Sequence, residues 1–478
     1  MIDRLQIQNF KTWKDTTELE LAPITVFFGG NSSGKSSIGQ FLMMLKQTAQ
    51  SQDRTLALLP GSEQTPVDLG TFEDVLHNHD LTQNLDFSLR FRLDEPVILT
   101  DILTRKTYEG NILQFSSSLE VISLERPQPR CVEFEYKLSR VSRILIGGKP
   151  RFILRQIASA SVKQKEVAEE YSLETSGIKV KRNQGRGWPL PAPYHFYGFP
   201  DQISSYYKNA SNLTRLPVAL QECLAGISYL GPLREYPHRE YSWAGESPSD
   251  VGTAGRNWLA AYMAAANRKL LPPRGRRKQS FAAVVATWLK ELGLIAEFEV
   301  KKIGGVRSYQ VKVRLHENSE WVHLPDVGFG VSQVLPVLVQ SLYAPSGGTV
   351  VMEQPELHLH PAVQSNLADF FVHTVNSRAE EPGGSVQFLL ESHSEHFLRR
   401  LQRRIADETI PANKVAVYFC TSDICGASRI ERLKLDEYGN ILNWPENFFG
   451  DQMTDIAEMT KAGNRRRREA KLTNVQAK

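Results

Sequence analysis

The chain has 478 residues, of which 41% are hydrophobic and 23% charged, a composition typical of a soluble globular protein with two or three domains. Its four cysteines are too few for a disulfide scaffold, and no run of about 18 apolar residues predicts a membrane-spanning helix. The formal net charge is +4, yet residues 461–478 alone contribute +6, so the rest of the chain is nearly neutral.

The N-terminal stretch MIDRLQIQNF lacks the basic start and apolar run of a signal peptide, so we expect a cytoplasmic protein with no membrane partner. The basic tail, residues 461–478, is suited to contact nucleic acid or an acidic partner, and a solvated, frayed terminus explains it equally well. Cys420 and Cys425 are spaced C-x4-C, but no second pair follows, which argues against a zinc site.

The N-terminal residues predict two strands and a helix. Residues 5–10 alternate apolar and polar side chains, and residues 24–28 form a short, β-rich apolar run suited to a buried strand. A helix is expected next, because apolar side chains recur there at intervals of three and four residues: Ile38, Phe41, Leu42 and Leu45.

The middle of the chain changes character twice. Residues 84–160 alternate repeatedly, which predicts an antiparallel sheet with one solvent-facing side, whereas residues 160–225 are weakly patterned. Helices are expected around 255–268 and 280–292, followed by a hairpin over 297–316.

From residue 330 to residue 420 helical and strand patterns alternate, which is typical of a parallel α/β core. No heptad pattern is sustained over several turns, so no long coiled coil is expected. The sequence therefore predicts an α/β fold with a parallel core sheet, an antiparallel β lobe and a helical insertion.

Residues 29–36, GGNSSGKS, match the phosphate-binding pattern G-x-x-x-x-G-K-[ST] and lie between a predicted buried strand and a predicted helix. These flanks favour a P-loop over a chance glycine-rich turn, because the loop amides and the helix N-terminus would then face phosphate groups. We expect Lys35 to reach the β- and γ-phosphates of ATP and the Ser36 hydroxyl to bind Mg²⁺. The nucleotide-binding residues expected in this loop are Gly29, Asn31, Ser32, Ser33, Gly34, Lys35, Ser36 and Ser37.

Two downstream strands end in residues suited to the same site. The apolar strand 349–352 runs into Glu353, a carboxylate placed to hold Mg²⁺ directly or through water. The strand 387–390 is followed by His393, which can contact a γ-phosphate or the attacking water. His358, together with the histidine two residues later, could bind zinc instead, but each histidine lies where a nucleotide-hydrolysing pattern already needs a residue.

These motifs together resemble the ABC-type ATPase heads of the SMC, RecF and OLD (overcoming lysogenization defect) group. The resemblance rests on the P-loop, on E-x-P-E-x-H-L-H-P over 353–361 and on S-H-S at 392–394. Three further segments are similar to parts of that group: IQNFK at 7–11 to the start of RecF-like heads, YLGPLR at 229–234 to a segment of OLD-like ATPases, and 440–449 to a short C-terminal domain of unknown function.

The resemblance implies a composite site in a homodimer of heads, and it is also compatible with a higher oligomer. Residues 326–333, DVGFGVSQ, stand at the place of the ABC signature loop. In such heads the signature loop of one subunit caps the γ-phosphate on the P-loop of the other. The residues expected to do so here are Gly328, Gly330, Ser332 and Gln333.

One position departs from the pattern of the group. ABC heads place a glutamate directly after the metal-binding Walker B acid, which corresponds to Glu353 here. In this chain Gln354 occupies the position of that glutamate. Glutamine can hold a water molecule but cannot take its proton. Two alternatives follow: Glu356 supplies the catalytic carboxylate, or hydrolysis is slow and ATP serves as a long-lived clamp. Gln354, Glu356 and His393 are the expected catalytic residues.

The expected domain boundaries follow from these patterns. The divisions are 1–95 and 320–420 for the two halves of the ATPase head, 96–225 for the β lobe, 226–319 for the helical and hairpin insertion, 421–460 for a small C-terminal domain and 461–478 for the tail.

By resemblance, stand-alone ATPases of this kind act in bacterial defence against phages or plasmids, with a separate nuclease or toxin as effector. No built-in Toprim nuclease is expected, because about eighty residues follow His393 and such a domain needs roughly a hundred. The alternative is a RecF-like repair factor that binds DNA through basic clusters, and a third reading, suggested by Gln354, is a regulatory ATP-binding protein. The basic clusters lie at 179–182, 274–278, 399–404 and in the tail.

Overall fold

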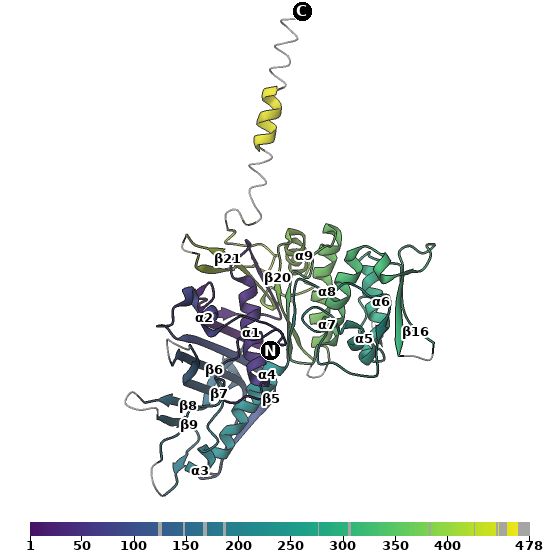
Figure 1. The fold of residues 1–478 in the computed structure, drawn as a ribbon. Helices are drawn as coiled ribbons and strands as arrows, with labels where there is room; N and C mark the ends of the chain where they lie inside the picture. Colours follow the sequence, from purple (N-terminus) through teal and green to yellow (C-terminus); the bar gives the residue numbers. More distant parts are fainter. Residues whose placement is uncertain are drawn as a thin grey trace, which may run out of the picture.

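The computed structural model describes residues 1–122, 127–146, 149–165, 170–184, 188–275, 277–304, 307–381, 384–424, 426–445, 448 and 457–466. Two sheets organise this part of the chain, with helices between them and on the outer face of one (Figure 1). The layers therefore run from an antiparallel sheet through helix α1 and a parallel sheet to a cluster of helices.

The parallel sheet has the strand order β12-β19-β20-β4-β21-β22, and only the edge strand β22 runs antiparallel. Both faces of its central strands are covered, so β4, β19 and β20 are buried almost throughout, as their unbroken apolar runs predict. In chain order the strands are β4 (Ile24–Gly29), β12 (Ile227–Leu230), β19 (Gly348–Glu353), β20 (Val386–Glu391), β21 (Val415–Ser422) and β22 (Ser428–Leu433).

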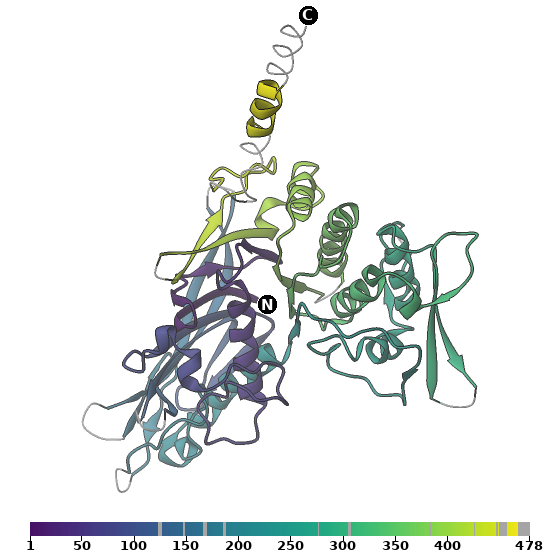
Figure 2. The same ribbon diagram turned by 45° about the horizontal axis from the view of Figure 1, so that its top comes forward.

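The antiparallel sheet has the order β2-β1-β5-β6-β7-β8-β9, with β3 paired to β1. Figure 2 shows its long strands gathered on one side of the molecule, away from the green helices. Its strands are β1 (Ile2–Phe10), β2 (Trp13–Asp15), β3 (Leu19–Glu20), β5 (Leu85–Asp101), β6 (Lys106–Val121), β7 (Pro129–Ile146), β8 (Lys149–Gln164) and β9 (Tyr171–Ser176).

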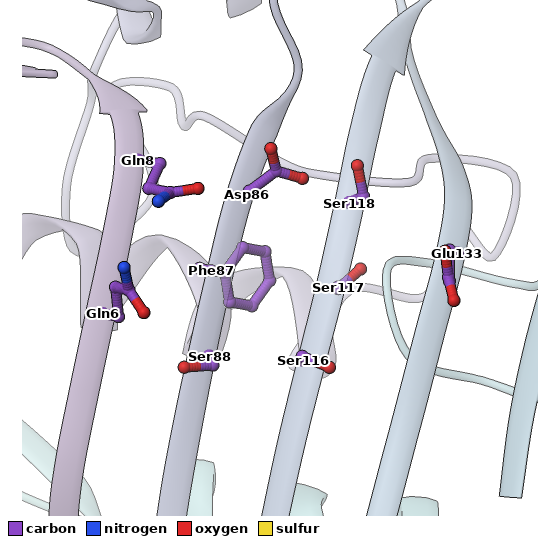
Figure 3. Close-up of a pocket in the computed structure, with 9 residues that line it drawn as sticks. All are labelled: Gln6, Gln8, Asp86, Phe87, Ser88, Ser116, Ser117, Ser118 and Glu133. Atoms are coloured by element: carbon purple, nitrogen blue, oxygen red, sulfur yellow. The ribbon is translucent and has the colours of Figure 1, made fainter. Parts of the chain in front are cut away.

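One face of the antiparallel sheet packs on the core and the other is polar. Along β5 and β6 buried positions alternate with half-buried ones, as period-two patterning predicts. A shallow hollow of about 240 Å³ lies on the polar face. Figure 3 shows short serines there between longer polar side chains such as Gln6 and Glu133. The expectation of an antiparallel lobe with one wet face is confirmed.

Helix α1 (Lys35–Gln50) lies between the two sheets and is buried on both sides. Phe41 packs edge-on against Phe10 and Phe87 of the antiparallel sheet, and Val351 and Leu389 of the parallel sheet belong to the same core cluster. The remaining helices on this side are α2 (Phe72–Val75), α3 (Ile203–Tyr206) and α4 (Arg215–Ala225). The helix that follows the P-loop is thus held by both halves of the molecule.

In the described part of the chain, five helices cover the other face of the parallel sheet: α5 (Trp258–Ala265), α6 (Phe281–Glu291), α7 (Phe329–Tyr343), α8 (Pro361–Ala379) and α9 (Glu395–Ala406). A small sheet lies at the edge of this cluster, with β13 (Tyr241–Ser242), β16 (Glu297–Ile303), β17 (Ser308–Arg314) and β18 (Val322–His323). Short elements complete the described chain: β10 (Lys181–Arg182), β11 (Tyr207–Lys208), β14 (Lys269–Leu270), β15 (Gln279–Ser280), 3₁₀ turns at His77–His79, Ala210–Thr214, Leu324–Asp326 and Ala412–Lys414, and a helix over 457–466.

The expected fold class is confirmed, since a parallel core sheet, an antiparallel lobe and a helical insertion are all present. The longest helix in the described residues, α8, has 19 residues, and no helix there combines the length and apolar character needed to cross a membrane. β1, within residues 1–95, and β5, which continues past residue 95 to Asp101, belong to the antiparallel sheet. β12, within 226–319, is an edge strand of the parallel sheet.

Candidate active site

The loop from Gly29 to Ser36 joins β4 to α1 at the carboxyl end of the parallel sheet. Gly29 has φ 144°, and a Cβ there would lie 2.0 Å from the carbonyl oxygen of Cys420 on β21. Gly34 has φ 83°, and a Cβ there would lie 2.6 Å from the hydroxyl oxygens of Thr12 and Ser428. Only glycine satisfies both positions without strain, because other residues disfavour this backbone and would clash.

The Lys35 side chain is buried within the loop. Its ammonium group donates to the carbonyl oxygens of Gly30 at 2.6 Å and Gly29 at 3.2 Å, and it lies 3.8 Å from a carboxylate oxygen of Glu391. Asn31 and Ser32 are exposed at the tip of the loop, while Ser33 and Ser37 are buried. The loop therefore presents its backbone outward and holds a positive charge beneath it, which is the arrangement that binds phosphate groups.

Two carboxylates face this loop from neighbouring strands. Glu353 and Glu391 end β19 and β20 and are directly paired in the register of these parallel strands. The Ser36 hydroxyl donates to Glu391 at 2.6 Å, and both carboxylates are more than nine-tenths buried. A hydroxyl and two carboxylates are the hard oxygen donors that Mg²⁺ prefers, so the residues present fit this metal. The sequence had pointed to Ser36 and Glu353, whereas the contact of Glu391 was missed.

Glu353 is held by a tyrosine from the neighbouring strand β12. The Tyr229 hydroxyl donates to a Glu353 carboxylate oxygen, and burial raises the pKa of both groups. The neighbouring Ser36 hydroxyl opposes that shift in the Glu353 pKa. Lys11, which donates to Gln40 at 2.7 Å, adds a positive charge whose field reaches Glu353. Tyr229 was not among the expected site residues, because the sequence does not reveal which strand lies next to β19.

The turn after β19 carries Gln354 and Glu356. Gln354 has φ 44°, a left-handed conformation that non-glycine residues adopt at a cost in free energy, and its backbone N–H donates to the backbone carbonyl oxygen of Glu391 at 2.9 Å. Glu356 is 6% exposed, and one of its carboxylate oxygens accepts from the Ser392 hydroxyl and the His393 backbone N–H, both at 2.8 Å. Burial raises the pKa of Glu356. Glu356 thus anchors the loop that presents His393.

His393 lies at the opening of the site. Its side chain is 35% exposed, and its Nε2 atom is 4.0 Å from a Glu391 carboxylate oxygen. Burial and the nearby Lys35 charge lower the pKa of the imidazole, which favours the neutral form. A neutral imidazole can accept one hydrogen bond and donate another, so His393 is equipped to contact a phosphate oxygen or a water molecule.

His358 and His360, the H-x-H pair, both make structural contacts. The ring Nδ1 of His360 accepts from the Ala362 N–H at 3.3 Å and caps α8, and His358 packs against Phe329 with 6.2 Å between ring centroids. Among the described residues, no group of three or more His, Cys, Asp or Glu side chains is placed to hold a metal ion on its own. Cys425 lies outside the described residues, whereas Cys420 is buried in β21.

The signature segment forms the start of α7. Gly328 precedes the helix and is exposed, and a Cβ at Gly330 would lie 3.5 Å from Leu359 of the segment after β19. Ser332 and Gln333 are buried, and the Ser332 hydroxyl donates to the Phe329 carbonyl at 2.9 Å. The glycines therefore lie at the surface, while the Ser332 side chain is turned toward the helix start.

The basic cluster on α9 is largely neutralised by neighbouring acids. Arg400 and Arg404 both bind Asp369 of α8, at 2.5 and 2.7 Å. Arg399 pairs with Glu395 at 3.2 Å and stacks on the Trp444 ring. Paired guanidinium groups have less charge available for a phosphate backbone, so this cluster is a weaker nucleic-acid surface than its sequence indicates.

Three family models match the chain. Residues 1–186 match the model described as "AAA ATPase domain", and residues 228–399 match "AAA domain, putative AbiEii toxin, Type IV TA system". Residues 410–459 match a "protein of unknown function". The P-loop lies in the first match and the two carboxylate-bearing strand ends lie in the second, so both walls of the site fall in segments that are similar to AAA ATPase models.

Solved structures similar to this chain include SMC heads. The SMC head domain from Thermotoga maritima is 10% identical, with 91% of this chain and 99% of that chain covered and a TM-score of 0.39. The Smc head domain with an extended coiled coil, bound to the C-terminal domain of ScpA and derived from Pyrococcus furiosus, is 9% identical, with 96% and 99% covered and a TM-score of 0.37. No curated protein matches the chain.

Proposed function

We propose that the chain binds ATP with Mg²⁺ between the P-loop and the carboxyl ends of β19 and β20, and hydrolyses it slowly. One observation carries this proposal: Lys35 and Ser36 face Glu353 and Glu391, which lie side by side on neighbouring strands. A cation, a hydroxyl and paired carboxylates on opposite walls are what a metal-bound triphosphate requires.

Each residue has a distinct task in this proposal. Lys35 and the loop amides neutralise phosphate charge, and Ser36, Glu353 and Glu391 hold the metal. Mg²⁺, when bound, supplies charge neutralisation at the phosphate oxygens. His393 and the side chain of Gln354 position water near the γ-phosphate.

The contacts of Glu356 favour slow ATP hydrolysis over a role for Glu356 as the catalytic base. Its carboxylate is buried and one oxygen is taken up by Ser392 and the His393 N–H, so it acts on the position of His393. Gln354 cannot accept a proton from water. Without an exposed carboxylate beside the water, hydrolysis depends on positioning and charge alone, and the nucleotide stays bound for long periods.

A long-lived nucleotide suits a clamp that holds two heads together. We propose a homodimer in which Gly328 and Gly330 of one subunit approach the nucleotide on the other, with a separate effector protein attached. The surface position of both glycines supports this arrangement. The model that matches residues 228–399 names a toxin–antitoxin system, which fits a role in bacterial defence.

The alternative role is ATP-controlled DNA binding, as in a RecF-like repair factor. The exposed basic residues of segment 179–182 favour it. The ion pairs of Arg400 and Arg404 weigh against it. A repair factor would bind duplex DNA only with ATP and with a steep salt dependence.

Steady-state hydrolysis by the purified chain, with and without duplex DNA, tests the proposal. We expect slow, Mg²⁺-dependent turnover that DNA does not change, and loss of turnover in Lys35→Ala. The control is Lys14→Ala, which removes the same charge at an exposed position. Turnover that survives Lys35→Ala would contradict the proposed site, and stimulation by DNA would favour the repair role.

A further inference from the structure

The segment after β12 sends one arginine into the interior beside the site. Arg234 is 7% exposed, and its Nη2 atom donates to the backbone carbonyl oxygens of Glu353 at 3.1 Å and Gln354 at 3.2 Å. These are the last residue of β19 and the strained residue that follows it. A single guanidinium group therefore bridges the two peptide units on which the metal-binding and water-positioning side chains stand.

The same guanidinium keeps two donors unused. Among the described residues, Nε and Nη1 of Arg234 have no hydrogen-bond partner, and neither has the Oε2 atom of Glu356. The two charges lie close enough to interact, since each opposes the effect of burial on the other's pKa. A buried charge without a counter-charge is costly, so Arg234 and Glu356 stabilise one another even without a direct hydrogen bond.

We infer that Arg234 is a positioning residue for hydrolysis, which fixes the Glu353–Gln354 turn through its two carbonyl contacts and balances the buried carboxylate of Glu356. Through Glu356 it also supports the His393 loop, because Glu356 accepts the His393 N–H. This inference rests on the proposed ATP hydrolysis at the site. Among the described residues, Arg234 makes no hydrogen bond to Lys35 or Ser36.

Geometry explains why an arginine is needed at this position. The guanidinium is planar, with donors fixed in a fork, so one nitrogen can serve two carbonyls while the delocalised positive charge offsets that of Glu356. A lysine at position 234 would keep the charge and lose the fork. A methionine would fill a similar volume and lose both.

Arg378 on α8 offers a matched control within the same chain. It is 4% exposed, its Nη2 donates to the Ala344 carbonyl at 3.0 Å, and its Nε and Nη1 have no hydrogen-bond partner among the described residues, although Nη1 lies 4.0 Å from a Glu381 carboxylate oxygen. Arg378 is thus a second buried arginine with a carbonyl contact, and that contact lies outside the Glu353–Gln354 turn. Any effect specific to the site should appear at position 234 and not at 378.

The first experiment separates turnover from binding. We expect Arg234→Met to lower kcat at least about tenfold while KM and the Kd for ATP stay within about twofold, because Lys35 and Ser36 are untouched. Arg234→Lys should recover part of kcat, and Arg378→Met should lower Tm with kcat unchanged. Unchanged kcat in Arg234→Met, or an equal loss in Arg378→Met, would overturn the positioning role.

The second experiment does not depend on hydrolysis. Thermal unfolding is measured for Arg234→Met, Glu356→Gln and the double variant, which form a double-mutant cycle. If the two charges balance, Arg234→Met should lower Tm by several degrees alone and by clearly less when Glu356 is already neutral. Additive shifts would overturn the inferred pairing. Absence of wild-type hydrolysis would refute the proposed function, and this cycle would still decide the pairing.

Discussion

Two regions of the molecule carry rows of polar side chains, and they use them differently. On the open face of the antiparallel sheet, the half-buried Gln6 and Gln8 donate to the exposed Asp15 at 3.2 and 2.8 Å. At the carboxyl edge of the parallel sheet, Glu353 and Glu391 are buried beside Ser36 and Lys35. Solvated polar side chains contribute little to the free energy of folding. Buried carboxylates lower the stability of a fold and are typical of functional sites, so the second row marks the site.

The two regions also differ in their backbone. In the antiparallel lobe the strands follow regular pairing, with few register shifts over β5 to β8, although turns there also contain left-handed residues such as Lys11 and Arg105. At the edge of the parallel sheet Gly29, Gly34, Gln354 and His358 all have positive φ. Strain of this kind persists only where surrounding contacts hold it, and at this edge it lies in the turns that bring Lys35, Ser36 and Glu353 together.

The largest effect is expected at Gly29. Gly29→Ala places a Cβ 2.0 Å from the Cys420 carbonyl oxygen, so β4 and β21 must separate, with a loss of about 3 kcal/mol or more in unfolding free energy. At Gly30, by contrast, a Cβ would meet no atom within 4 Å, and Gly30→Ala should stay within about 0.5 kcal/mol. Chemical denaturation of both variants measures this. Equal stability of the two variants would refute the strained loop.

Glu391 is the next test of the contrast between the two rows. Glu391→Gln removes a charge from the metal site, so the Mg²⁺ concentration needed for half-maximal ATP binding should rise about tenfold. The matched change on the sheet face, Glu135→Gln, alters a carboxylate that pairs with Lys137 at 2.6 Å near the surface and should leave Mg²⁺ dependence unchanged. Competition with Mn²⁺ by electron paramagnetic resonance reports the metal directly. The same Mg²⁺ requirement in both variants would contradict the role of Glu391.

A pair of buried tyrosines sharpens the comparison. Tyr229 donates to the Glu353 carboxylate, and Tyr136 in the lobe donates to the Tyr197 carbonyl at 2.9 Å. Each phenylalanine substitution should cost about 1 kcal/mol in stability, because each leaves a buried acceptor unpaired. Only Tyr229→Phe should also change the Mg²⁺ dependence of hydrolysis, by a few-fold. A change in Tyr136→Phe as well would mean that general loosening, and not Glu353, is responsible.

The smallest effect concerns acid stability of the lobe. Burial alone would raise the pKa of Asp101, but hydrogen bonds from the backbone of Lys179, Leu103 and Thr104 lower it to about 2. Because the pKa is lowered on folding, the stabilising contribution is present above the unfolded value of 3.8 and is lost as pH falls toward about 2. Asp101→Asn should flatten the stability curve over this pH window. A curve as steep as that of the wild type would contradict this reading.

The sequence predicted the local parts of this architecture well. The P-loop between β4 and α1 and the long alternating strands of the lobe each follow from a short pattern, and a short pattern needs no knowledge of the rest of the fold. The end of β19 at Glu353 was predicted for the same reason. The hairpin β16–β17 also lies within the predicted range, residues 297–316.

The parts that sequence reasoning missed depend on which strands are neighbours. Glu391 meets Ser36 because β20 lies between β19 and β4, and Tyr229 meets Glu353 because β12 lies on the other side of β19. These pairs are separated by more than a hundred residues, and no local pattern encodes the order of strands in a sheet. The available signal for Glu391 was a carboxylate that ends an apolar strand, the same signal that identified Glu353.

Calorimetric titration with ATP, in the presence of Mg²⁺ and again in EDTA, tests the central claim most directly. The wild-type chain should bind ATP with Mg²⁺ at least about tenfold more tightly than without it, and Lys35→Ala should weaken binding by about a hundredfold or more. Equal binding with and without Mg²⁺, or full binding by Lys35→Ala, would contradict a metal-bound triphosphate held between Lys35, Ser36 and the two carboxylates.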